Sequence, residues 1–114
     1  MKAVILAFGL ALAAGSARAD AIAPSQATAH VGQTVTVEGT VSDVFATRSG
    51  VTFLDIGGAY PNNAFAVVIF KDDASKFPDA DSLSGKTVDV TGSIRLYRGK
   101  PEIVLSDPAQ LRTK

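Results

Sequence analysis

Two segments of this chain, residues 34–41 and 87–94, alternate apolar and polar residues and carry a glycine at the same place in the alternation. Their inward apolar positions are Val35, Val37 and Val41 in the first segment and Val88, Val90 and Ile94 in the second. Because strand side chains point alternately to opposite faces, each segment is predicted to be a strand buried on one side. A glycine inside a strand indicates a bulge or bend. The first segment therefore favours a curled sheet in which one long strand serves two parts.

Three further strands and one helical connection are predicted between and after these segments. Residues 51–56 follow a turn signal at 48–50 and are rich in β-branched and aromatic residues. Residues 64–70 are nearly all apolar, which indicates a strand covered on both sides. Residues 71–83 lose this β character and predict a short helical connection that Pro78 stops. The last short strand is expected at residues 102–105, after a tight turn.

The order of these elements predicts an all-β fold. Three strands, a helical turn and two more strands within about 80 residues match the five-stranded Greek-key barrel called the OB-fold. The barrel domain is expected to span residues 31–114. Residues 20–30 have neither strand nor helix period and predict a flexible lead-in.

Residues 1–19 have the features of a secretory signal peptide. Lys2 precedes an apolar run at 3–14, and Ala17 and Ala19 occupy both positions of an Ala-x-Ala cleavage site. The alternative is a membrane anchor, but about 12 apolar residues fall short of the roughly 20 that a spanning helix needs. We therefore expect a periplasmic or secreted protein without stable membrane insertion after cleavage.

Charge and cysteine content narrow the function classes. The chain has 11 basic and 11 acidic residues, and cleavage removes Lys2 and Arg18, which leaves a formal charge of −2. A protein that coats nucleic acid through phosphates alone needs many cations, so such binding would require positive charge to be locally concentrated. The absence of cysteine excludes disulfides, thiol catalysis and cysteine metal sites.

Four segments carry a resemblance to a known superfamily. They are GQTVTVEGTV at 32–41, TFLDIG at 52–57, LSGKTVDVTG at 83–92 and YRGKPEI at 97–103. Through them, residues 31–111 resemble the nucleic-acid-binding OB domains of the anticodon-binding and helicase type, and are similar to small exported bacterial proteins of that superfamily. The resemblance implies the fold, but OB barrels also bind sugars, peptides and proteins, so the ligand must be argued from the surface.

Six residues are predicted to bind a ligand. In this fold oligonucleotides use the exposed face of strands 2 and 3 and the loops joining strands 1 to 2 and 4 to 5. The candidates are Arg48, Arg95, Arg98 and Lys100 for phosphates, and Tyr60 and Tyr97 for stacking on bases. This hypothesis requires Arg48 and Arg98 to meet at the same rim of the barrel.

Structural roles also account for several aromatic and basic residues. Phe53 and Phe65 lie in strands that are apolar on both faces, which favours core packing over stacking. The Tyr97 ring is equally suited to covering the end of the barrel. The segment 98–101 is also compatible with an ordinary soluble turn.

The sequence offers no catalytic set or metal motif. His30, the single imidazole, stands in the lead-in, and Asp72, Asp73, Asp79 and Asp81 do not reproduce a calcium-binding loop. We therefore expect no enzymatic activity, no cofactor and no metal. The leading hypothesis is an exported OB-fold module for single-stranded nucleic acid or another anionic ligand. The alternative is a periplasmic protein-interaction or envelope-stress module that binds a polypeptide partner.

Overall fold

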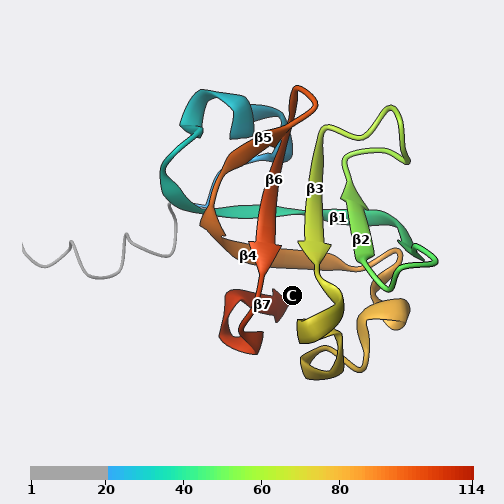
Figure 1. Ribbon diagram of the computed structural model, residues 1–114. Coiled ribbons are helices and arrows are strands. Elements are labelled where there is room, and N and C mark those ends of the chain that lie inside the picture. The colour runs from blue at the N-terminus through green and yellow to red at the C-terminus, as the bar shows by residue number, and fades with distance from the viewer. Residues whose placement is uncertain (1–20) are drawn as a thin grey trace, which may run out of the picture.

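The computed structural model describes residues 21–114, so the expected signal peptide lies outside the described residues. Seven strands form one sheet in the order β5-β6-β3-β2-β1-β4-β7 (Figure 1). The strands are β1 (Thr34–Ala46), β2 (Thr52–Ile56), β3 (Phe65–Ile69), β4 (Thr87–Ser93), β5 (Arg95–Tyr97), β6 (Lys100–Leu105) and β7 (Leu111–Thr113). The 3-10 helices are η2 (Pro24–His30), η3 (Lys71–Lys76), η4 (Ala80–Leu83) and η5 (Pro108–Gln110). None of the helices between residues 21 and 114 has the length and apolar character of a membrane crossing.

The strand order β3-β2-β1-β4 is that of the predicted Greek key, but the strands form one open sheet and the predicted closed barrel is not confirmed. Strands β1, β2 and β3 pair antiparallel in sequence, β4 returns beside β1, and β6 runs parallel to β3. The predicted helical connection between β3 and β4 is present as η3 and η4. The prediction of five strands is wrong, because β5 pairs with β6 and β7 pairs with β4. Segments of three residues are too short to give a recognisable period.

Strand β1 serves two parts of the sheet, as its length suggested. Residues 34–40 pair with β4 and residues 41–46 pair with β2, with a register shift between Val41 and Asp43. In Figure 1, β1 and β4 pass behind β3 and β6. A Cβ on Gly39 would lie 2.6 Å from Cγ2 of Ile56. The glycine is therefore required by close packing at the bend, and the bulge follows it by a few residues.

The core lies between the two parts of the sheet. Its fully buried side chains include Val37, Val41, Leu54, Ile56, Phe65, Val67, Val88, Val90 and Ile103. Strand β3 is buried along its whole length, as predicted. Because Leu54 and Ile56 of β2 point inward, Phe53 and Asp55, which alternate with them, point to the outer face.

The segment expected to be a flexible lead-in is instead packed against the sheet from Ile22 onward. The Ile22 N–H donates to Thr36 O at 2.8 Å, and Ile22 O accepts from the Glu38 N–H at 2.9 Å. Helix η2 follows, and its Ala27 is completely buried. The expected start at Val31 is thus too late, because a 3-10 helix built from small residues shows no apolar period.

The backbone ladders leave the sheet open between β4 and β6, and the Gln110 side chain bridges this gap. Its Nε2 donates to Thr91 O of β4 at 3.0 Å and to Val104 O of β6 at 3.2 Å. Its Oε1 accepts from the N–H groups of Ser106 and Asp107 at 2.9 and 3.0 Å. One side chain therefore satisfies backbone groups on both sides of the gap.

We expect Gln110→Ala to lower the free energy of unfolding by about 1–2 kcal/mol, because it leaves several backbone groups without their partner. The matched control is Gln33→Ala, since within residues 21–114 the Gln33 side chain bonds only the His30 ring, and its loss should cost less than about 0.5 kcal/mol. Urea denaturation measures both changes. Equal losses for the two variants would contradict the bridging role.

Candidate functional site

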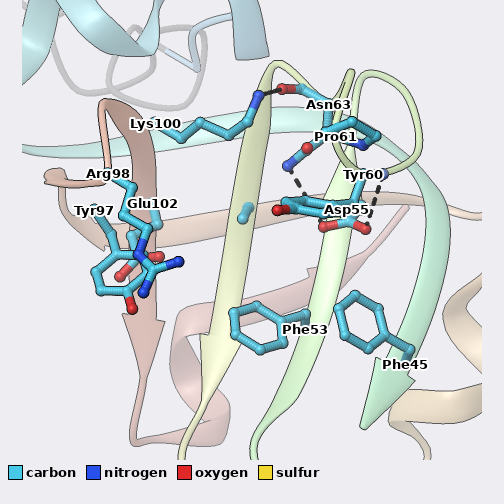
Figure 2. Close-up of a pocket in the computed structure, with 11 residues that line it drawn as sticks. Phe45, Phe53, Asp55, Tyr60, Pro61, Asn63, Tyr97, Arg98, Lys100 and Glu102 are labelled. Carbon is cyan, nitrogen blue, oxygen red and sulfur yellow. Dashed lines mark hydrogen bonds between the residues drawn. The ribbon is translucent and has the colours of Figure 1, made fainter. Parts of the chain in front are cut away.

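A groove of about 290 Å³ lies on the outer face of the sheet, over β2, β3 and β6. The loop 57–64 and the β5–β6 hairpin form its walls, as Figure 2 shows. Its lining includes Phe45, Phe53, Tyr60, Tyr97, Arg98 and Lys100. Four of the six residues predicted to bind a ligand line this groove, namely Tyr60, Tyr97, Arg98 and Lys100, whereas Arg48 and Arg95 do not.

Two stacked phenylalanines form the aromatic side of the groove. Phe45 and Phe53 are partners in the β1–β2 ladder, and their ring centroids lie 5.2 Å apart with an interplanar angle of 20°. The prediction that Phe53 packs in the core is wrong, because Leu54 and Ile56 occupy the inner face of β2 and Phe53 lies on the outer face. Phe65 is completely buried, as expected.

The loop 57–64 is fixed at the upper rim of the groove and presents Tyr60 to solvent. The Tyr60 N–H donates to Asp55 Oδ2 at 3.3 Å, and Asn63 Nδ2 donates to Phe65 O at 3.1 Å. Lys100 Nζ donates to Asn63 O at 3.0 Å, which ties the loop to β6. Tyr60 is 67% exposed, so its ring is free to contact a ligand.

Arg98 occupies a backbone position that does not favour arginine. Tyr97 pairs with Lys100, and the two residues between them, Arg98 and Gly99, have φ angles of 53° and 82°. Positive φ at both central positions favours asparagine, aspartate or glycine and costs other residues about 1–2 kcal/mol. Turn geometry alone therefore does not explain this arginine. Its guanidinium carbon lies 5.3 Å from the centroid of the half-exposed Tyr97 ring.

Arg95 lies beside this groove and is paired with an acidic residue. Its Nε is 2.7 Å from Oε2 of Glu102, which stands directly opposite it in the β5–β6 ladder. The Glu102 side chain is 6% exposed, whereas that of Arg95 is 51% exposed. Arg95 thus neutralises a nearly buried carboxylate and keeps its outer end in solvent.

The structure does not bring Arg48 to this groove. Because β3 and β6 are parallel, the β5–β6 hairpin lies beside the loop 57–64 at one end of the strands. The β1–β2 turn lies at the other end, where Gly50 packs against Lys71. Figure 1 shows these two ends apart. The prediction that Arg48 and Arg98 share one rim is therefore wrong.

Asp55 places a carboxylate on the floor of the groove, where it is 2% exposed. Burial raises the pKa of Asp55 above its ordinary value of 3.8, and the negative charge of Asp43 adds to this rise. The Tyr60 N–H and the Lys100 charge act in the opposite direction. The floor thus carries an acidic group that holds its proton more tightly than a free aspartate.

Phe45 and Asp55 line the groove but were not among the predicted site residues. The signal for Asp55 was present, since it alternates with Leu54 and Ile56 and so marks the outer face of β2. The same alternation places Phe53 outside. Phe45 could be found only from its pairing with Phe53, which depends on the bulge in β1.

His30 and the aspartates of residues 71–83 also lie outside the groove lining. His30 is in η2, where its Nδ1 is 3.0 Å from Gln33 Oε1. In residues 21–114, no three His, Asp or Glu side chains converge in a way that could hold a metal ion. The aspartates of residues 71–83 therefore contribute charge to the helical connection, where Asp73 pairs with Lys76 at 2.8 Å.

Solved structures share this fold. Asparaginyl-tRNA synthetase from Pyrococcus horikoshii matches 82% of this chain with a TM-score of 0.62 and 18% identity, and aspartyl-tRNA synthetase from Entamoeba histolytica matches 75% with a TM-score of 0.53 and 14% identity. The S. pombe Stn1-ten1 complex matches 71% with a TM-score of 0.54 and 22% identity. The match covers 23% and 19% of the two synthetase chains and 57% of the third chain. These likenesses show an OB-like fold. No protein-family model and no curated protein matches the chain.

Proposed function

We propose that this protein is a non-enzymatic module that binds single-stranded nucleic acid in the groove over β2 and β3. The observation that carries the proposal is the facing of aromatic rings and cations across one groove, with Phe45, Phe53 and Tyr60 on one side and Arg98 and Lys100 on the other. Export to the periplasm or the medium is part of the proposal and is supported by the sequence of residues 1–19.

This arrangement suits the chemistry of a single strand. Unpaired bases stack on aromatic side chains, and the phosphates pair with guanidinium and ammonium groups. The outer face of β2 and β3 is also the face that OB-folds use for oligonucleotides. A duplex hides its base faces, so we expect the groove to discriminate against it.

Titration of the purified protein with fluorescent oligo-dT, read by anisotropy, tests the proposal. The two cations of the groove, Arg98 and Lys100, predict two phosphate contacts, so the affinity should fall roughly sevenfold between about 50 and 200 mM salt. A duplex of the same length is the matched control and should compete weakly. Absence of binding at the lower salt concentration would reject the proposal and favour the polypeptide partner.

The raised pKa of Asp55 predicts that binding strengthens in acid. As the pH falls towards the folded-state pKa, the carboxylate takes up a proton and the groove loses a negative charge that opposes phosphate. The buried charge of Asp55 also destabilises the folded protein at pH values above the folded-state pKa. This destabilisation disappears once the pH is below 3.8, because the carboxyl group is then protonated in the folded and the unfolded protein alike.

We expect Asp55→Asn to raise the affinity for oligo-dT at neutral pH by roughly three- to fivefold and to weaken its pH dependence. Thymine does not titrate in acid, so the ligand itself contributes no change. Asp81→Asn, on the exposed helical connection, is the control and should leave the affinity as it was. A weaker affinity in Asp55→Asn would show that the carboxylate contacts the ligand directly.

A further inference from the structure

A second hollow of about 250 Å³ adjoins the groove on the outer face of the sheet. It shares Phe53, Tyr97 and Glu102 with the groove and adds Val68, Phe70 and Arg95 to the lining. Phe70 is 42% exposed although it directly follows the buried strand β3. The exposed ring is therefore available to a ligand in this hollow.

The two hollows follow one another along β3. Ala66 lines the groove and Val68 lines the second hollow, and both belong to the outer face of the same strand. Two residues of a strand span about 7 Å. The two hollows are thus consecutive parts of one trough that runs from the loop 57–64 towards Phe70.

The second hollow repeats the pairing of a ring with a cation. The guanidinium carbon of Arg95 lies 5.7 Å from the centroid of the Phe70 ring. Its Nε bond to Glu102 holds the guanidinium in place, and within residues 21–114 its terminal nitrogens make no hydrogen bond. These nitrogens are available to donate hydrogen bonds to a phosphate, like the guanidinium nitrogens of Arg98 in the groove.

We infer that the second hollow is a second nucleotide subsite, so that the trough binds two consecutive nucleotides of one strand. The second base stacks on Phe70 while Arg95 contacts the adjoining phosphate. The cations Arg95, Arg98 and Lys100 all come from the β5–β6 hairpin, and the phenylalanines come from β1, from β2 and from the residue that follows β3. Cations and rings thus lie side by side along the trough, and a single strand supplies a partner for each, its phosphates for the cations and its bases for the rings. The inference rests on the proposed function.

A length series tests it. Thymidine 5′-monophosphate, dT2 and dT3 are titrated into the protein and followed by amide chemical shifts, which measure weak binding. In the unmodified protein, dT2 should bind roughly 5- to 150-fold more tightly than the mononucleotide, as expected for one added stacking contact. In Phe70→Ala this ratio should fall towards one.

Leu96→Ala is the matched control, since Leu96 is 50% exposed on β5 but alternates with Arg95 and Tyr97 and so faces away from the trough. It should keep the ratio of the unmodified protein. An unchanged ratio in Phe70→Ala would overturn the second subsite while leaving the first groove as the binding site. If none of the three ligands binds, the proposed function itself fails and this inference fails with it.

Discussion

Replacing Phe53 with alanine should weaken oligo-dT binding by roughly 5- to 150-fold, which corresponds to the loss of one base-stacking platform. Phe53 is the best single position because its ring stacks on Phe45 and lines both hollows of the trough. Anisotropy titration at low salt measures the change. We expect the largest effect of any single substitution here.

Phe53 is half-buried and packs against Phe45, so its replacement by alanine also lowers the stability of the folded protein. Phe53→Leu separates the two effects, since leucine keeps an apolar side chain on the strand but has no ring to stack. It should melt near the unmodified protein and still bind weakly. Full affinity in Phe53→Leu would contradict stacking as the source of binding.

Arg98→Asn should change affinity and stability in opposite directions. Asparagine suits the positive φ of this turn, so the variant should be at least as stable as the unmodified protein. Loss of the guanidinium should weaken oligo-dT binding roughly tenfold at low salt. The slope of log affinity against log salt should fall by about 0.7, the contribution of one phosphate contact on a single strand.

Arg48→Asn removes the same charge from the β1–β2 turn at the other end of the strands, so it is the matched control. Its affinity and salt slope should remain close to those of the unmodified protein. If Arg48→Asn and Arg98→Asn weaken binding equally, the cations act through net charge and the groove has no special role.

The fold could be predicted from the sequence because its long strands carry clear patterns. The alternation at 34–41 and 87–94 fixed their inner faces, and the apolar run of 64–70 indicated the doubly covered β3. The short strands β5 and β7 and the packed η2 could not be predicted, since their stability comes from tertiary pairing rather than from a local period.

The site could be predicted only in part. The hairpin and loop residues were found because basic and aromatic residues cluster near turn signals. The error about Arg48 came from topology, because a parallel β3–β6 pair necessarily separates the β1–β2 turn from the β5–β6 hairpin. Phe45 and Phe70 were missed because their exposure depends on how neighbouring strands end, which the alternation of one segment does not show.

The most direct test of the account is an amide chemical-shift map of the protein titrated with oligo-dT. We predict that the largest changes fall on Phe53, the loop 57–64 and the segment 95–102, with Phe70 following when the ligand has two or more nucleotides. The helical connection 71–83 beyond Phe70 should change little. Changes centred on η3 and η4, with the groove residues unaffected, would contradict the central claim that this trough is the binding site.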